Sequence, residues 1–288
     1  MRKNDFLRKL INFLVPKNRF GDKIYSFINF LINHKRFPTK RKLFNDYFYK
    51  IKTTNEILNP LRIFLSDKEY VKIYVKSQIG DEYNVPTLKI LRSFEDAHNF
   101  EFPSKCVIKP THMSGEVIIR KDNEIIDYNL IKKWFLSNYY NRSREANYKL
   151  LKPKVIVEEL LFNDENIKDY KFFCYKGETK IISVDIDRFA NNGNDHKRKY
   201  LNCSWEDLNF SILYERYEKE IEKPMNLNMM IEKVNKLASA TNLNLIRVDT
   251  YSNNKNFYIG EITNIHGNCS EHFFPKDSEE KASKFIFN

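Results

Sequence analysis

Apolar residues recur at helical spacing at the start of the chain. Five of them between residues 6 and 14 predict an amphipathic helix that Pro16 ends. A second, denser apolar segment runs over residues 24–32 and is followed by His34, Lys35 and Arg36. Such helices can lie flat on a membrane surface or pack on the rest of the protein, and we favour the packed arrangement.

The pattern changes to a mixture of helices and strands after residue 60. Helical spacing predicts helices over residues 67–80, 129–150 and 226–240. Short runs rich in β-branched and aromatic residues predict strands over 105–109 and 154–161, and hairpins pairing 116–120 with 124–126 and 169–175 with 179–187. Because the hairpins are antiparallel and no regular βαβ alternation appears, we expect an α+β fold.

The last predicted hairpin carries the most informative polar residues. Two strand-like runs, 246–251 and 257–262, flank a polar turn at 252–256. A turn centred on Lys255 would place Asp249 directly opposite Glu261, with Cβ atoms roughly 5 Å apart. Facing carboxylates repel unless a cation holds them or one is protonated. A few oxygen ligands suit Mg²⁺ carried in with a phosphate substrate. A shifted register, with both acids in solvent, is the alternative.

Composition and charge narrow the class of protein. The chain has 288 residues, of which 42% are hydrophobic and 15% aromatic, as in a globular protein. Its net charge of +11 favours anionic partners, although a general bias toward lysine would give the same surplus. No apolar run is long enough to span a bilayer, and no signal peptide is evident. Four cysteines without C-x-x-C spacing indicate reduced core residues, so we expect a cytoplasmic protein.

Further polar residues stand where predicted strands end. Lys109 closes an apolar strand, where its ammonium needs an anion such as a triphosphate. The loop that follows, 111–115, contains His112, Ser114 and Gly115, and its backbone N–H groups can cradle phosphate oxygens. Later strands bear Glu158 and Glu159, then Asp169 with Lys171, and then Asp185 with Arg188. Taken singly, each of these has an equally good interpretation as an ordinary surface ion pair.

Taken in order, these residues resemble the ATP-grasp superfamily, and more closely its TupA-like members from bacterial surface-polysaccharide clusters. The resemblance rests on residues 22–25, 67–72, 107–109, 138–145, 169–173, 185–188, 247–249 and 260–263. It implies an ATP-grasp fold, in which two α+β subdomains clamp ATP. The corresponding division is a helical, basic region at 1–100, a small subdomain at 101–161 and a large subdomain at 162–288.

The resemblance also implies a role for each candidate site residue. Lys109 and Lys171 would hold ATP phosphates, together with the loop at Ser114 and Gly115. The segment of Glu158, Glu159, Leu160 and Leu161 would form the hinge that reads adenine, and Asp169 would contact the ribose. Asp249 and Glu261, with Thr263 as a third ligand, would hold two Mg²⁺ ions. Arg188 would stabilise the transferred phosphoryl group with Lys171. His112, Arg142 and Arg144 are candidates for the acceptor side.

Three positions depart from the pattern of the family. Thr263 replaces a common Asn, Met113 a common Gly, and His266 a common Pro. Thr263 weakens the third metal position, Met113 stiffens the phosphate loop, and His266 indicates a changed acceptor.

The implied reaction is ligation of a carboxylate to an amine through an acylphosphate. The expected acceptor is a uronic acid of an anionic glycan, the expected donor is an amino acid or small amine, and the expected place is the cytoplasm or the inner face of the bacterial cytoplasmic membrane. A sugar kinase on the same fold and a non-catalytic glycan-binding protein are alternatives. No RNA-binding module is recognised, so no nucleic-acid partner is expected.

Overall fold

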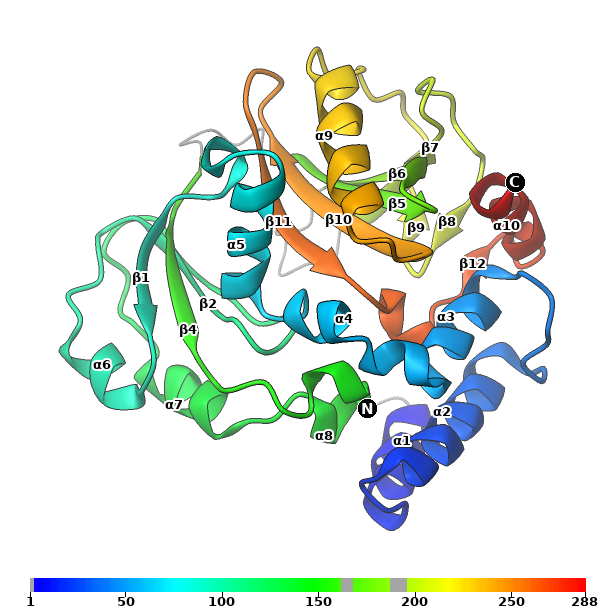
Figure 1. The fold of residues 1–288 in the computed structure, drawn as a ribbon, viewed down its shortest axis with the longest axis horizontal. Coiled ribbons are helices and arrows are strands. Elements are labelled where there is room, and N and C mark those ends of the chain that lie inside the picture. Colours follow the sequence, from blue (N-terminus) through cyan, green and yellow to red (C-terminus); the bar gives the residue numbers. More distant parts are fainter. Residues whose placement is uncertain (1–2, 162–167, 187–195) are drawn as a thin grey trace.

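The computed structural model describes residues 3–161, 168–186 and 196–288, with side chains from residue 6, and contains two main β-sheets (Figure 1). The smaller sheet has the strand order β1-β4-β2-β3, and all its pairs are antiparallel. Its strands are β1 (Thr87–Leu91), β2 (Cys106–Pro110), β3 (Ile118–Arg120) and β4 (Val155–Glu159). Two helices, α6 (Phe94–Asn99) and α7 (Tyr128–Leu136), pack on it around the buried Trp134.

The larger sheet has the strand order β11-β10-β5-β6-β7-β9 and is antiparallel except for its last pair. Its strands are β5 (Lys168–Tyr175), β6 (Glu178–Ile186), β7 (Lys197–Leu201), β9 (Glu215–Arg216), β10 (Leu245–Ser252) and β11 (Phe257–Thr263). A separate two-stranded sheet pairs β8 (Ser211–Ile212) with β12 (Phe273–Phe274).

Helices cover the larger sheet on both faces. On one face α5 (Lys68–Gln78) and α9 (Leu227–Ala240) enclose apolar residues such as Tyr170, Phe172 and Val248. On the other face α3 (Phe44–Thr53) and α10 (Ser278–Phe287) cover Phe173 and Tyr175. Because side chains alternate along a strand, the odd-numbered residues of β5 share this second face. Asp169 and Lys171 therefore extend the face beyond its apolar part.

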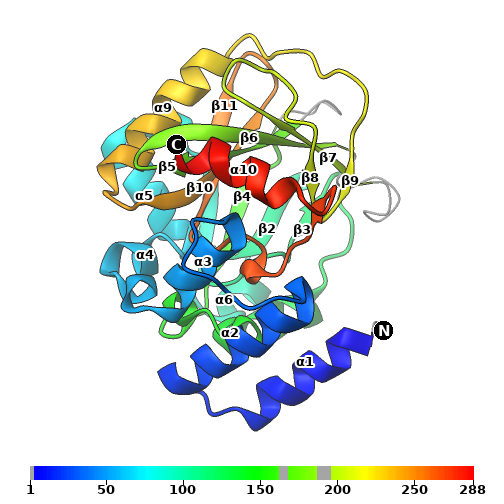
Figure 2. The ribbon, with the colours of Figure 1, turned by 90° about the vertical axis from the view of Figure 1, so that its right-hand side faces the viewer.

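The remaining helices connect these layers. Helices α1 (Lys3–Leu14) and α2 (Arg19–His34) lie at one end of the molecule, outside both sheets (Figure 2). The short helix α4 (Pro60–Phe64) precedes α5, and the short helix α8 (Tyr140–Ser143) precedes β4 of the smaller sheet. Within the described ranges, 3₁₀ turns occur at Asn55–Leu58, Asp81–Tyr83, Ala146–Tyr148 and His266–Cys269. Within the described residues no helix is long and apolar enough to cross a membrane.

Most elements predicted from the periodicity are confirmed. Helix α5 begins after Asp67, whose side chain accepts from the N–H of Glu69, and α9 and the β5–β6 hairpin fall where they were expected. All four cysteines are free, as predicted. The predicted packing is present for α2, where Tyr25 and Phe30 are buried, but not for the apolar side chains of α1, since Phe6, Leu10 and Leu14 are exposed.

Two predicted elements are wrong. Residues 124–126 do not pair with 116–120, since the carboxylate of Glu124 accepts from the N–H groups of Lys121 and Asp122 and closes a turn. Strand β3 pairs with β2 instead. The single helix expected over 129–150 is broken into α7, α8 and a 3₁₀ turn. Ser137 adopts an extended conformation after α7, and Arg144 adopts a left-handed one (φ 55°) after α8, and a continuous helix excludes both.

Strand β1 was not predicted from the sequence. It lies before residue 100, where the boundary between the N-terminal region and the small subdomain was expected. The smaller sheet therefore contains strands from both sides of that boundary.

Candidate active site

The β10–β11 hairpin brings Asp249 and Glu261 opposite each other, as the sequence predicts. The turn spans residues 253–256, and Ser252 pairs with Phe257. The turn is therefore centred between Asn254 and Lys255, and not on Lys255 as expected. One extra residue, Gly260, forms a bulge between the Asp249 and Thr250 pairs and restores the predicted partnership. A Cβ at this glycine would lie 2.7 Å from the ring of Tyr251, so the bulge suits glycine alone.

The opposed carboxylates are compensated by the guanidinium of Arg247. It donates to both oxygens of Asp249, from Nε at 2.6 Å and from Nη2 at 2.7 Å. Nη2 also lies 3.4 Å from Glu261 Oε1 and 3.1 Å from Thr263 Oγ1. Burial would lower the pKa of Arg247, but the charge of Asp249 outweighs it and raises that pKa. The arginine therefore stays charged and joins all three predicted metal-site residues.

These residues offer an incomplete set of ligands for a metal ion. Two carboxylates and one hydroxyl are oxygen donors of the kind that Mg²⁺ prefers. No group of three or more His, Cys, Asp or Glu side chains suited to a metal is found across the parts of the chain that the structure describes. The donor set thus fits an ion that takes its remaining ligands from phosphate oxygens.

Lys171 is the centre of a second group of acids beside Asp249. Its Nζ lies 2.6 Å from Asp169, 3.0 Å from Asp185 and 3.6 Å from Asp249. Although burial lowers the pKa of Lys171, these three carboxylates outweigh it and raise the pKa. Asp185 is also bound by the guanidinium of Arg198, with Nη2 at 3.3 Å from Oδ2. Lys171 is thus placed next to the acid pair, and Asp169 lies beside it.

On the smaller sheet, Lys109 at the end of β2 makes an ion pair of 2.6 Å with Glu158 of β4. The other oxygen of Glu158 lies 2.7 Å from Nζ of Lys72 on α5. Burial would raise the pKa of Glu158, but the two ammonium groups outweigh it and lower the pKa. The side chain of Glu158, expected in the hinge, is therefore engaged with the lysine expected to hold phosphate.

Lys68 connects the two sheets. Its Nζ lies 3.9 Å from Glu261 Oε2 and donates to the carbonyl of Met113 at 2.6 Å. Burial lowers the pKa of Lys68, and the nearby charge of Lys109 lowers it further while Glu261 opposes both. Lys109, expected to hold phosphate, and Glu261, expected to hold the metal, therefore both lie near Lys68.

The loop predicted to cradle phosphate lies between these charges. Gly115 has φ +86°, and a Cβ added there would meet no atom within 4 Å, so the loop borders open space. Arg142 donates to the carbonyl of Ser114 at 3.2 Å, which places this acceptor candidate beside the loop.

Two other acceptor candidates are enclosed within the protein. His112 is buried, with Nε2 3.2 Å from the carbonyl of Trp134 and Nδ1 3.4 Å from the N–H of Lys154. Arg144 is fully buried and donates to the carbonyls of Asn12, Val15 and Pro16. These contacts engage both side chains with backbone groups of the protein.

The predicted hinge residues are the last two of β4, Glu158 and Glu159, and the two that follow it, Leu160 and Leu161. Glu159 is exposed, whereas Leu160 and Leu161 are half-buried. The N–H of Glu159 donates to the carbonyl of Pro86, so the hinge also adjoins the segment before β1. Arg188, predicted to stabilise the transferred phosphoryl group, lies outside the described residues.

Several residues of the site were missed from the sequence. Arg247, Lys68 and Lys72 had no predicted role, although Arg247 stands two residues before Asp249 on the same strand face, a signal that was available. His266 accepts from Arg247 at Nδ1 (2.6 Å), and its Nε2 lies 2.7 Å from Glu271. His266, which departs from the family pattern, thus connects Glu271 to Arg247 and helps to hold the guanidinium against Asp249.

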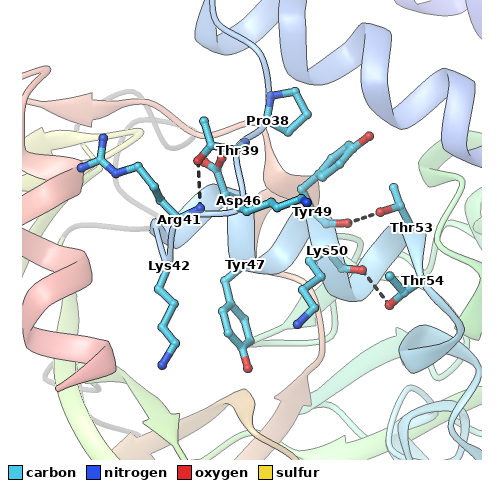
Figure 3. Close-up of a pocket in the computed structure, with 11 residues that line it drawn as sticks. Pro38, Thr39, Arg41, Lys42, Asp46, Tyr47, Tyr49, Lys50, Thr53 and Thr54 are labelled. Carbon is cyan, nitrogen blue, oxygen red and sulfur yellow. Dashed lines mark hydrogen bonds between the residues drawn. The ribbon is translucent and has the colours of Figure 1, made fainter.

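A hollow of about 620 Å³ lies elsewhere, between α3 and the segment before it (Figure 3). Figure 3 shows basic and tyrosine side chains around it, among them Arg41, Lys42, Tyr47 and Lys50. None of the predicted site residues lines this hollow.

Comparisons with solved structures give distant similarities. The chain is 16% identical to a D-alanine–D-alanine ligase from Helicobacter pylori, with a TM-score of 0.40, covering 77% of this chain and 60% of that protein. It is 15% identical to an N5-carboxyaminoimidazole ribonucleotide synthetase in an ADP complex (TM-score 0.43; 72% and 47% covered). It is 12% identical to an L-amino acid ligase from Bacillus licheniformis (TM-score 0.42; 77% and 49% covered).

The chain therefore spans less than two thirds of the length of these three proteins. A search of curated protein sequences gives no match. The model of the TupA-like ATP-grasp family matches residues 48–286, which include both sheets and all the described site residues. The chain has the ATP-grasp fold and belongs to the TupA-like ATP-grasp family.

Proposed function

We propose that this protein is an ATP-dependent carboxylate–amine ligase that acts through an acylphosphate. The observation that supports this most directly is that Lys68, on α5 between the two sheets, lies near both Lys109 of the smaller sheet and Glu261 of the larger one. Lys68 lies 3.9 Å from Glu261 and within the electrostatic influence of Lys109. The ammonium groups would bind the negative phosphates of a polyphosphate, and the carboxylates would bind its metal ion.

The nucleotide would lie between the two sheets. Lys109 and Lys171 are buried and Lys68 is half-buried, and each ammonium group can bind phosphate oxygens once the nucleotide displaces its present carboxylate partner. The backbone N–H groups around Ser114 and Gly115 add further donors. The hinge from Glu158 to Leu161 would take the adenine, and Asp169 would accept from the ribose.

The metal would be Mg²⁺, proposed as two ions, and Asp249 and Glu261 would hold it with Thr263 beside them. When bound, it would neutralise charge on the phosphate oxygens during transfer. Arg247 is held at the same place by His266 and would stabilise negative charge on the group being transferred. Arg188 is proposed for the same task from the family resemblance.

The reaction would take place in two steps. A carboxylate oxygen of the acceptor attacks the γ-phosphorus of ATP, and the bond from that phosphorus to the bridging oxygen of ADP breaks. The amine then attacks the acyl carbon, phosphate leaves with the oxygen it received, and the amine loses a proton. The protein contributes positioning and charge neutralisation, and no nucleophilic side chain is required.

The acceptor that we propose is a uronic acid of an anionic cell-surface glycan, and the donor an amino acid or small amine. The positive net charge of +11 favours a polyanionic acceptor. The expected place of the reaction is the cytoplasm, at the inner face of the bacterial membrane.

A mass measurement tests the ligase against a kinase of the same fold. The protein is incubated with ATP, Mg²⁺ and a uronic-acid oligosaccharide, with and without an amino acid. A ligase gives an oligosaccharide heavier by the amino acid less one water, and only when the amino acid is present. A kinase gives a stable phosphorylated sugar without it, which would overturn the proposal. Asp249→Asn serves as the inactive variant, and Asp122→Asn, at an exposed turn, as its matched control.

A further inference from the structure

Helices α1 and α2 present a row of exposed apolar side chains that no part of the described chain covers. Phe13 is 85% exposed, Leu14 is 69% exposed and Phe20 is 69% exposed. Further members are Phe6, Leu7, Leu10, Phe27 and Phe37. At 100° per residue, those of α1 at positions 6, 7, 10, 13 and 14 lie on one side of the helix.

The charge that residues 6–46 contribute around this row is positive, and Arg41 of this segment forms an exposed ion pair with Glu280 of α10 at 2.6 Å. Residues 6–46 contain ten lysines and arginines and only two acids, Asp22 and Asp46. Both acids are buried, Asp22 against Arg144 and Asp46 against Arg36. The exposed charges of this part of the chain are therefore cations, among them Lys9, Lys17, Lys23, Lys35, Lys40, Arg41 and Lys42.

We infer that the outer surface of α1 and α2, together with the basic segment 35–42, docks on an anionic lipid bilayer. Exposed Phe and Leu side chains can enter the boundary between head groups and acyl chains, while lysines at the margin contact acidic head groups. A second copy of the chain would bring two sets of cations together, and their repulsion disfavours that occupant. Charge complementarity thus selects the membrane.

Helix α1 is firmly attached to the rest of the protein. Arg144 donates to the carbonyls of Asn12, Val15 and Pro16 at 2.7–2.8 Å, and Asn12 donates to the carbonyl of Asn141 at 2.7 Å. The neighbouring Arg142 donates to the carbonyl of Ser114 in the predicted phosphate loop. A bilayer bound at α1 would therefore lie near the candidate active site, where a lipid-linked acceptor could reach it.

Vesicle co-sedimentation of the full chain tests the surface. We expect binding to phosphatidylcholine vesicles that contain phosphatidylglycerol, no binding to phosphatidylcholine alone, and release by high salt. Phe13→Ser with Leu14→Ser should weaken binding about tenfold or more, because two apolar anchors are lost. Lys9→Ala with Lys17→Ala should weaken it by roughly fivefold per lysine. Since these side chains are exposed, the variants should fold normally, which their melting temperatures check.

Matched variants at other exposed positions serve as controls. Ile125→Ser with Leu150→Ser, at side chains 97% and 83% exposed, and Lys121→Ala with Lys152→Ala should bind as the wild type does. Equal loss in test and control variants, or no sedimentation with anionic vesicles, would overturn the inference. So would a dimer, detected by light scattering, that Phe13→Ser with Leu14→Ser abolishes. The measurement needs neither ATP nor acceptor, so its failure and that of the ligase are distinguishable.

Discussion

At the scale of single residues, the site depends on how each buried carboxylate is balanced. Asp249 is 4% exposed and is held between Arg247 and Lys171, whereas Glu261 contacts Arg247 and Lys68. A buried charge without a partner would be strongly destabilising. Because the balancing groups are all cations, an entering metal ion competes with them for the same oxygens, and the phosphates that arrive with it can take up the displaced cations.

Removal of one carboxylate charge should abolish turnover but leave the fold intact. In Asp249→Asn or Glu261→Gln the amide still accepts a hydrogen bond from Arg247, but its affinity for a divalent cation falls. We expect turnover to fall by about a hundredfold or more, measured as phosphate released in the presence of acceptor and amine. A near-wild-type rate in either variant, with Asp122→Asn as reference, would show that these acids do not hold the metal.

Glu145 provides a test of stability against pH. Burial raises the pKa of Glu145 to about 7 in the folded protein, from an ordinary value of 4.5. A raised carboxyl pKa favours the neutral form, so its contribution to stability is present below pH 4.5 and is lost as the pH rises toward 7. Glu145→Gln should therefore raise the free energy of unfolding by about 1–3 kcal/mol at pH 8 and leave it unchanged at pH 4.

Chemical denaturation at the two pH values measures this difference. Glu95→Gln, at an exposed position of α6, is the matched control and should have no pH-dependent effect. An equal effect of Glu145→Gln at both pH values would mean that this carboxyl is not held neutral by burial.

At the scale of elements, the hairpins determine which residues meet. The β10–β11 hairpin aligns the acid pair, and the β5–β6 hairpin aligns Lys171 with Ser183 and Asp169 with Asp185. The alternation along each strand then divides its residues between an apolar face under α9 and a charged face at the site. One hairpin turn therefore sets the positions of several charged groups at once.

The β5–β6 turn should be sensitive to substitution at Gly177. This glycine has φ +85°, and a Cβ there would lie 2.8 Å from Cα of Ser239 on α9. Gly115 has nearly the same φ, +86°, without any neighbour within 4 Å. We expect Gly115→Ala to cost about 1 kcal/mol from backbone strain and Gly177→Ala to cost about 2–3 kcal/mol more, because the backbone of α9 must move. Equal losses of stability in urea would show that the turn does not press against α9.

At the scale of the whole molecule, the proposed nucleotide site is shared between two sheets. Lys109 and Glu158 come from the smaller sheet, Asp249 and Glu261 from the larger, and Lys68 of α5 lies between them. Helices α1 and α2 lie outside this arrangement (Figure 2) and leave their outer face exposed. The proposed ATP-binding groups and the proposed membrane contact thus belong to different elements, which contacts of Arg142 and Arg144 connect.

Binding of ATP with Mg²⁺ should stabilise both halves together. At a hundredfold excess over Kd the expected rise in melting temperature is about 5–10 °C. Lys109→Met should lose most of this rise while still folding, because Glu158 keeps Lys72 as a partner. Lys121→Met, at an exposed position on the same half, is the control. A full rise in Lys109→Met, measured by differential scanning fluorimetry, would remove Lys109 from the nucleotide site.

The candidate site was predictable from the sequence only in part. The facing of Asp249 and Glu261 and the position of Lys109 at a strand end follow from local periodicity and turn residues. Arg247 could have been found, since it shares a strand face with Asp249. Lys68 and Lys72 could not, because the helix that carries them meets Glu261 and Glu158 only after the chain has folded. The break at Arg144 was equally hidden, since its guanidinium contacts α1, more than 120 residues earlier in the chain, only in the folded protein.

Local pattern alone therefore determined the α+β class, the acidic hairpin and the amphipathic character of α1 and α2. These features depend on side-chain periodicity and short-range hydrogen bonding, which neighbouring residues specify. Only the tertiary structure decided which cations balance each buried acid, which predicted helix breaks, and which face of α1 and α2 stays in solvent. Those outcomes depend on burial and on contacts between distant segments, whose energies exist only once the sheets and helices are packed together.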